Sequence, residues 1–350
     1  MTDVNYLTKT ELHHAFNTGN LDASAQQAII DQLIKDGLYS TSNDGKAVWV
    51  ESDIYKGVPQ HPFFDANGNP TVPPFVQVLE VEGQNVTVHT DSALKVIVDD
   101  GSHSHNTLNV TGGSNPEFIV LGNSNTTVNL NDSGNDTVIG GDGNDSITAN
   151  SGNDKIYGDE GNDTLRGGSG ADSLYGGPGH DQLIAGTGHH SLLVAGSGPT
   201  TMTDLLSHGT DTLVAGSGSD TLTGVQGDAF LLPTSGSSGG KDVYNIHDGS
   251  GNSTIDLGTG HDTVNFFTTA GNDTITNAGG ADTVNFKGSA TDDLTDIKSI
   301  TPGTGAHSGD YLIKFTDGQS VDLIGHSDPA SKTAFTLEFK DGNLDLKGGS

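Results

Sequence analysis

The sequence contains no cysteine and few hydrophobic residues. The absence of Cys from the 350 residues excludes disulfides, thiolate metal sites and cysteine nucleophiles. Hydrophobic residues make up only 31% of the chain and aromatic residues 6%, so we expect a thin core spread along a repeat array. No stretch approaches the ~18 consecutive apolar residues of a membrane-spanning helix, so no membrane insertion is expected.

Basic residues are also scarce. The chain has 14 Lys+Arg against 45 Asp+Glu, which gives a formal net charge of −31. Binding to nucleic acid or to an anionic membrane requires clustered Lys and Arg, so neither is expected as a partner. Solubility alone would account for an acidic chain. The carboxylates, however, are regularly spaced, and this spacing favours cation binding.

Recognisable catalytic motifs are missing as well. The sequence has no H-E-x-x-H. Its one G-x-S-x-G match, "GSSGG" at 236–240, belongs to a Gly/Ser run, and "GHSDP" at 325–329 ends in Pro. "FFDANGNP" opens like an EF-hand loop at Asp65, but Val76 stands where that loop requires Glu, so we interpret it as a turn. We therefore predict that the protein is not an enzyme.

Residues 1–83 are predicted to form a small α+β N-terminal domain. The segment 21–37 has apolar residues at helical spacing and Asp22 as an N-cap, and 46–55 reads as a strand. A Pro-rich loop is expected over 59–74. The first residues show no basic region followed by an apolar one, so no Sec-type signal peptide is expected.

Residues 84–130 carry short alternating apolar pairs about every ten residues, separated by polar turns. This pattern predicts solenoid rungs. The pairs are Val86/Val88, Val96/Val98, Leu108/Val110, Phe118/Val120 and Val128/Leu130.

A nine-residue repeat then begins, with units such as "GGDGNDSIT" and "GDEGNDTLR". Each unit has one aliphatic residue and several glycines, which excludes an amphipathic helix. A three-residue strand and a six-residue turn fit the period, so two units make one coil of eighteen residues. The lone aliphatics are Val138, Ile147, Ile156, Leu165, Leu174, Leu183 and Leu192. In "GTGHHSLL" the same register puts His190 at the position of the Asp.

We predict an interrupted array rather than one unbroken block. The first block covers 131–232, is interrupted near 199–207 and decays at "GDAF" (227–230). A second block covers 233–290, where one eleven-residue gap predicts a small bulge. Residues 291–350 contain two strand pairs around Asp317-Gly318 and Asp341-Gly342, which predict antiparallel hairpins as an end cap.

The predicted coil stacks the repeated aspartates along its edges. Asp136 and Asp154, for example, would lie one coil apart. Two such charges at 4–5 Å repel by ~1 kcal/mol in water and ~4 kcal/mol at an effective dielectric of 20. A hard divalent cation would relieve this repulsion, and Ca²⁺ suits irregular cages of oxygen ligands. The candidate ligands are Asp136, Asp145, Asp154, Asp163, Asp172, Asp181, Asp211, Asp220, Asp262, Asp273 and Asp282.

The units "GGDGNDSIT", "GDEGNDTLR", "GGSGADSLY" and "GGPGHDQLI" resemble the G-G-x-G-x-D-x-U-x nonapeptide of RTX (hemolysin-type) calcium-binding proteins. Close matches cover 131–193, and looser ones cover 206–232 and 248–286. The resemblance implies a parallel β-roll with Ca²⁺ bound between successive turns by Asp side chains and turn carbonyls. It also implies type I secretion through a C-terminal signal and folding in external calcium. By the same comparison, the rungs at 84–130 would be calcium-free, and the sites at His190 and 227–230 weak or empty.

The predicted fold is therefore all-β for most of the chain. It is a parallel β-roll or β-solenoid, preceded by the α+β domain and followed by the hairpins. Two functions remain open. One is a structural, self-associating extracellular component of a matrix, surface layer or filament, because open solenoid ends are templates for further strand pairing. The other is a monomeric calcium-dependent adhesin or polysaccharide-binding module, with a cell-surface or polysaccharide partner, which the end cap favours.

Overall fold

The structure is a computed structural model, and the chain separates into two compact units, residues 1–178 and 179–350, each described here by itself. The predicted helix at 21–37 and the Pro-rich loop at 59–74 lie outside the described residues. The described residues are 5–7, 47–52, 78–81, 85–90, 96–99, 106–204, 211–225, 229–233, 240–247, 252–258, 260–267, 272–277, 282–287, 296–302, 310–316, 320–324, 335–339 and 341–346.

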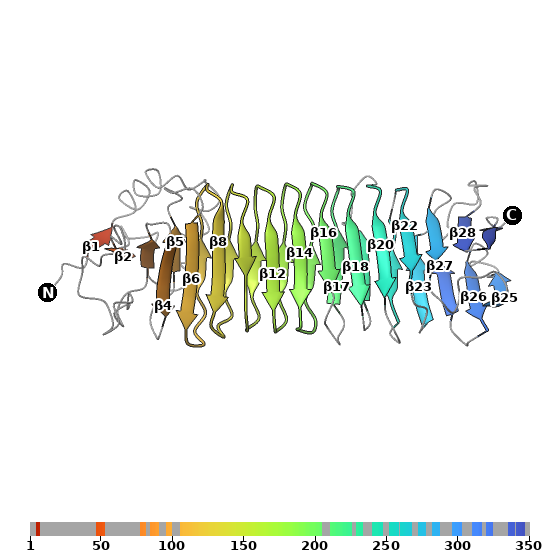
Figure 1. The fold of residues 1–350 in the computed structure, drawn as a ribbon, viewed down its shortest axis with the longest axis horizontal. Coiled ribbons are helices and arrows are strands. Elements are labelled where there is room, and N and C mark those ends of the chain that lie inside the picture. The colour runs from red at the N-terminus through yellow and green to blue at the C-terminus, as the bar shows by residue number, and fades with distance from the viewer. Residues whose placement is uncertain are drawn as a thin grey trace, which may run out of the picture. The chain divides into compact units, whose positions relative to one another are not determined.

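The first unit winds its strands alternately into two sheets, which Figure 1 shows in red to yellow-green. The described strand pairs of this unit are parallel, except that β1 (Asn5–Leu7) runs antiparallel to β2 (Ala47–Ser52). One sheet continues through β3 (Val78–Val81), β5 (Val96–Asp99), β7 (Phe118–Val120), β9 (Thr137–Ile139), β11 (Lys155–Tyr157) and β13 (Ser173–Tyr175). The other contains β4 (Asn85–Thr90), β6 (Asn106–Gly112), β8 (Thr126–Asn131), β10 (Ser146–Thr148) and β12 (Thr164–Gly168).

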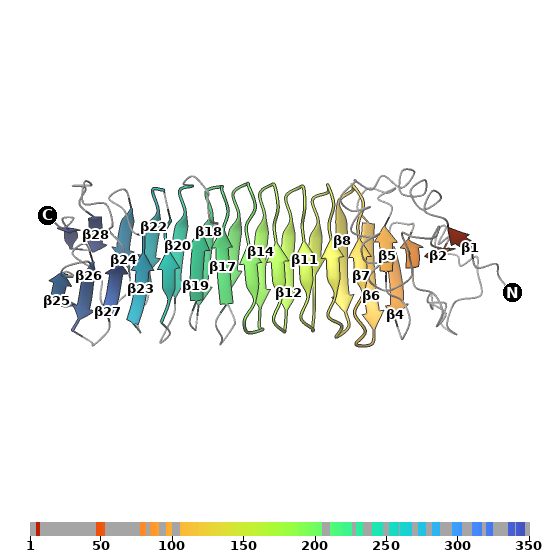
Figure 2. The same ribbon diagram turned by 180° about the vertical axis from the view of Figure 1, so that it is seen from behind.

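The second unit repeats this arrangement, which Figure 2 shows from behind. One sheet contains β14 (Gln182–Gly186), β16 (Thr201–Asp204), β18 (Thr221–Val225), β20 (Val243–His247), β22 (Thr263–Phe266), β24 (Thr283–Phe286), β28 (Phe335–Phe339) and β29 (Gly342–Leu346). The other contains β15 (Leu192–Val194), β17 (Asp211–Ala215), β19 (Ala229–Pro233), β21 (Thr254–Asp256), β23 (Asn272–Thr276), β27 (Ser320–Ile324), β26 (Tyr311–Phe315) and β25 (Ile297–Pro302).

The lone aliphatic of each repeat sets the register of the strands. Ile147 pairs with Val128 on one side and Leu165 on the other, and all three side chains are completely buried. Ile156 pairs in the same way with Leu174, eighteen residues later. Each short strand therefore contributes one buried aliphatic to a row that runs along the sheet. This confirms the parallel β-solenoid and the coil of two nine-residue units.

Two apolar positions differ from the expected pattern. Ile119, not Phe118, is completely buried in β7, and it pairs with Val138 of the next coil. In β15 the completely buried residue is Leu193, while the predicted Leu192 is only partly buried. Period-two alternation places neighbouring residues on opposite faces, so a shift of one residue moves the buried side chain to its neighbour.

The two predicted C-terminal strand pairs are present. β26 runs antiparallel to β27, and β28 runs antiparallel to β29. β27 and β28 also pair in parallel with the solenoid strands β23 and β24. Both hairpins therefore continue the two sheets, although the turn at 317–319 lies outside the described residues.

Neither α-helices nor candidate membrane-spanning helices occur in the part of the chain that the structure describes.

Candidate metal centre

The predicted aspartates occupy equivalent places at the edges of both units. Nine of them directly precede a strand, Asp211 is the first residue of β17 and Asp273 is the second residue of β23, so each side chain sits where the chain enters the sheet. All eleven are at most 5% exposed, from Asp211 at 0% to Asp282 at 5%. Ionised carboxylates are rarely buried without a partner charge or several hydrogen bonds. Their burial therefore requires a physical explanation at every turn.

Part of that explanation is a ladder of hydrogen bonds between consecutive coils of the first unit. On the edge before β9, β11 and β13, the amide of one turn-end residue donates to Oδ1 of the Asp one coil later. On the other edge, before β10 and β12, the same contact recurs. The pairs are Glu117–Asp136 at 2.8 Å, Asp136–Asp154 at 2.7 Å, Asp154–Asp172 at 2.8 Å, Thr126–Asp145 at 2.7 Å and Asp145–Asp163 at 2.8 Å.

The second unit has the same ladder on both edges. Its donor–acceptor pairs are Thr200–Asp220 at 2.8 Å, Asp220–Asp242, Asp242–Asp262 and Asp262–Asp282 at 2.9 Å each, Ser191–Asp211 at 2.7 Å and Ser253–Asp273 at 2.8 Å. On the edge before β18, β20, β22 and β24 the aspartates are neighbours one coil apart, whereas Asp211 and Asp273 each have a serine in the preceding coil. Asp181, 4% exposed, stands at the equivalent place before β14.

Asp242 belongs to the ladder but was missed by the sequence reasoning. It is 5% exposed and lies between Asp220 and Asp262 on one edge. The signal was present, because Gly240-Lys241-Asp242 is a Gly-x-Asp step directly before a strand. The coil that leads to it is 22 residues long, and a Gly/Ser run precedes it.

The placement of His190 at an Asp position is wrong. His190 is exposed and has a positive φ of 66°, whereas Ser191 is 1% exposed and directly precedes β15. The Ser191 amide makes the ladder contact to Asp211. One additional residue in this turn has therefore shifted the register, and a serine occupies the aspartate place. The weak turn predicted at 227–230 lies largely outside the described residues.

The second carboxylate oxygen distinguishes these residues from ordinary capping aspartates. Oδ2 of Asp136, Asp211 and Asp262 is buried and accepts no hydrogen bond. Each of these carboxylates thus keeps a lone-pair-bearing oxygen that is shielded from water and has no donor. Such an atom costs free energy unless something positive approaches it.

Backbone carbonyls lie in the same narrow space between coils. At Gly170, which has a φ of +136°, an added Cβ would lie 1.5 Å from the carbonyl oxygen of Gly152. At Gly158 an added Cβ would lie 2.3 Å from Oδ2 of Asp163. The turns therefore stack so closely that only glycine fits, and the space is lined by carbonyl and carboxylate oxygens.

Burial raises the pKa values of several ladder carboxyls. It raises the pKa of Asp154 to about 7, and the neighbouring charges of Asp136 and Asp172 add to the effect. Burial likewise raises the pKa of Asp262 to about 7 and that of Asp242 to about 6. The amide hydrogen bonds of the ladder act in the opposite direction but are outweighed. The ionised ladder is thus electrostatically unfavourable by itself.

These properties fit a hard divalent cation. The donors are carboxylate and carbonyl oxygens, they are buried, and they carry excess negative charge. Ca²⁺ accepts six to eight oxygen ligands in irregular geometry, whereas Zn²⁺ prefers nitrogen and sulfur.

Comparison with known families agrees with the site geometry. The sequence model described as the RTX calcium-binding nonapeptide repeat (4 copies) matches residues 131–165, 157–189, 209–229, 245–266 and 265–284. The predicted resemblance is therefore confirmed, and Ca²⁺ is the cofactor of these repeats. No curated protein matches the chain significantly.

Proposed function

We propose that this protein, which carries the RTX calcium-binding nonapeptide repeat, is a secreted, non-catalytic scaffold that folds when Ca²⁺ binds its turns. The observation that supports this best is the ladder of buried carboxylates, in which Oδ2 of Asp136, Asp211 and Asp262 accepts no hydrogen bond. Without a cation, each coil that carries an Asp at this place adds another buried carboxylate to the edge. With a cation, the same coils are held together by charge attraction.

We assign the turn-end aspartates as the calcium ligands, together with the carbonyl oxygens of the turns. Calcium, when bound, supplies positive charge and links one coil to the next. The chain's own contribution is to hold Oδ1 by an amide of the preceding coil, as at Asp136 and Asp262, where the buried Oδ2 accepts no hydrogen bond. The assigned residues are Asp136, Asp145, Asp154, Asp163, Asp172, Asp181, Asp211, Asp220, Asp242, Asp262, Asp273 and Asp282.

Calcium-dependent folding suits a chain exported unfolded. A thin core and a net charge of −31 disfavour a compact state without calcium. RTX proteins are typically exported by type I systems, and external calcium would then trigger folding after export. We propose the same route for this protein, with the signal in residues 291–350.

Self-association into a matrix, surface layer or filament is the role we place first. Among the described strands, β4 pairs only with β6 and forms one end of its sheet. Its outer edge offers backbone groups to a strand of a second copy. A heterologous contact of this kind does not close and gives open assemblies.

A monomeric adhesin or polysaccharide-binding module is the second candidate, and a different edge supports it. β25 ends one sheet of the second unit and carries exposed Lys298 and Pro302. Lysine and proline on an edge strand oppose further strand pairing.

Two measurements on the full chain test these proposals. Circular dichroism should show a β spectrum in calcium that is lost on chelation, and a spectrum unaffected by chelator would contradict calcium-dependent folding. Light scattering should then show very large particles only in calcium. A compact monomer at high concentration in calcium would defeat self-association and leave the adhesin as the surviving candidate.

A further inference from the structure

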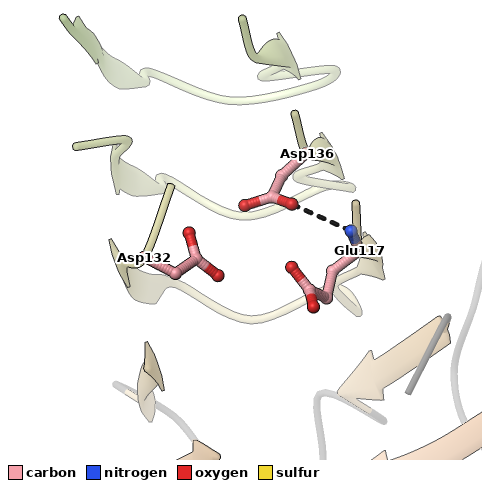
Figure 3. Close-up of side chains that lie close together, drawn as sticks. All are labelled: Glu117, Asp132 and Asp136. Atoms are coloured by element: carbon pink, nitrogen blue, oxygen red, sulfur yellow. Dashed lines mark hydrogen bonds between the residues drawn. The ribbon is translucent and has the colours of Figure 1, made fainter. Parts of the chain in front are cut away.

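Three buried carboxylates meet in the first unit, and only one of them belongs to the predicted ligand set. Glu117, Asp132 and Asp136 each place an oxygen within 4.8 Å of the other two. The three side chains are 3%, 8% and 1% exposed, respectively. Figure 3 shows the carboxylates of Asp132 and Glu117 reaching toward each other below that of Asp136.

The solenoid brings the three together from two consecutive coils. Glu117 is the last residue before β7, at the place that Asp136 occupies one coil later before β9. Asp132 directly follows β8, so it stands at the opposite end of the turn that Asp136 closes. The Glu117 amide donates to Oδ1 of Asp136 at 2.8 Å, which fixes the two coils at close approach.

Asp132 has no counterpart in several of the other turns. It holds the second position of the turn 131–136, where Gly141, Gly168 and Gly177 stand in later turns. Asp159 holds this position in the turn 158–163, but it is only partly buried and has a positive φ of 63°. Those glycines have positive φ, whereas Asp132 does not. A carboxylate at this position therefore adds an oxygen donor that the glycine turns lack.

The electrostatics of the group call for a positive charge. Neither carboxylate oxygen of Asp132 makes a hydrogen bond, and Oδ2 of Asp136 also lacks one. Asp132 is only 8% exposed, so its carboxylate is also shielded from water. The side chain of Asp132 is thus more than nine-tenths buried, lacks a hydrogen-bond partner and points into a cluster of like charge.

We propose that Glu117, Asp132 and Asp136 hold an additional Ca²⁺ ion, which ties the last rung before the matched repeats to the first matched turn. Three carboxylates without nitrogen or sulfur donors suit a hard cation, and carboxylates that bind through one or both oxygens suit the irregular coordination of Ca²⁺. Mg²⁺ demands regular octahedral geometry and retains its waters. The ion extends calcium binding to Glu117, within the rungs at 84–130 for which none was expected. The inference rests on the proposed function only in taking Ca²⁺ as the available ion.

The test compares full-length Asp132→Asn and Glu117→Gln with wild type by calcium titration calorimetry and by thermal melting with and without calcium. Glu160→Gln is the matched control, because it removes one negative charge from an exposed turn residue of the same unit. Asp132→Gly serves as a second variant, since glycine fits the equivalent position of other turns. We expect each site variant to bind one ion fewer than wild type and the control to bind the full number.

Where a site variant folds poorly, the direction of the change in melting temperature shows whether an ion binds at this cluster. If no ion binds, removing one of three like charges relieves repulsion and raises the melting temperature with or without calcium. If an ion binds, the variants melt lower than wild type in calcium, or fail to fold there, while the control is unaffected. Unchanged stoichiometry with an equal or higher melting temperature in calcium overturns the inference. A wild-type chain that binds no calcium would instead overturn the proposed function itself.

Discussion

The backbone amide of Asp136 donates a 2.7 Å hydrogen bond to Oδ1 of Asp154, eighteen residues later, and both side chains are almost completely buried. Asp154 in turn donates its own amide to Asp172. Each aspartate thus depends on the coils on either side for its orientation. Because repeat arrays gain stability mainly from nearest-neighbour interfaces, loss of one coil weakens its neighbours. We expect calcium to fold the array cooperatively.

The calcium-free chain should be more stable at acidic than at neutral pH. Burial raises the pKa values of Asp154 and Asp262 to about 7 and that of Asp242 to about 6, from an ordinary value of 3.8. A pKa that is higher in the folded state contributes stability below about pH 4, and that stability is lost as pH rises through 6–7. Circular dichroism of calcium-depleted protein should therefore show more β structure at pH 5 than at pH 8.

Calcium-saturated protein provides the control for this pH dependence. Calcium binds the ionised carboxylates, so protons compete with it and the trend should reverse, with lower stability at pH 5 than at pH 8. Equal β signals for the calcium-free chain at both pH values would contradict this prediction.

Substitution at Ser191 should create a calcium ligand that substitution at His190 cannot. Ser191 is buried at the end of its turn and contacts Asp211 through its amide, whereas His190 is exposed. We expect Ser191→Asp to lower the free calcium at the folding midpoint roughly two- to tenfold, as an added charge contact of ~0.5–1.4 kcal/mol would do. His190→Asp, its matched control, should leave the midpoint unchanged in a circular dichroism titration. A larger shift for His190→Asp than for Ser191→Asp would instead place residue 190 at the ladder position, as the sequence spacing predicted.

Gly170→Ala should destabilise the calcium-bound array. The new methyl group would lie 1.5 Å from the carbonyl oxygen of Gly152, and the φ of +136° is unfavourable for any side chain. We expect a loss of roughly 1–3 kcal/mol or more in the free energy of unfolding, measured with urea in saturating calcium. Glu160→Ala, at an exposed position in a neighbouring turn, should change it by less than ~0.5 kcal/mol. Similar stability of the two variants would mean that the coils are not packed this closely.

The repeating part of the fold could be predicted because its period leaves few alternatives. One aliphatic in nine residues, as at Ile147 and Ile156, fits a short strand and a turn but no helix. The same spacing placed the eleven aspartates at the edges, because residues one coil apart must stack. The two C-terminal strand pairs were predicted from their Asp-Gly turns.

Three features were not predicted correctly from the sequence, and each has a local physical cause. At 187–191 a turn gained one residue, and two adjacent histidines gave no sign of which one preceded the strand. Asp242 follows a 22-residue coil, so the nine-residue period did not predict its place. Glu117 and Asp132 meet only because a turn folds back between coils, and their separation of 15 residues matches no repeat. The repeat period therefore predicts features that recur in successive coils, but not a contact that occurs in a single coil, such as that of Glu117 with Asp132.

Phe286→Ala should cost more stability than Phe267→Ala, because the two rings lie on opposite faces of one sheet. Phe286 is 2% exposed, stacks on Phe266 and Phe339 with ring centroids 5.4 and 4.8 Å apart, and meets Phe315 edge-on at 5.2 Å. Phe267 is half-buried and stacks only on His247, with Lys287 beside its ring. Truncation of a fully buried Phe typically costs ~3–5 kcal/mol, and we expect that loss for Phe286→Ala in urea unfolding with saturating calcium. The Phe267→Ala control should lose less than half as much. Because the ring contacts of both residues are to other aromatic rings and Lys287, neither variant should change the number of calcium ions bound. A reduced number would mean that the aromatic rows also position the metal-binding turns.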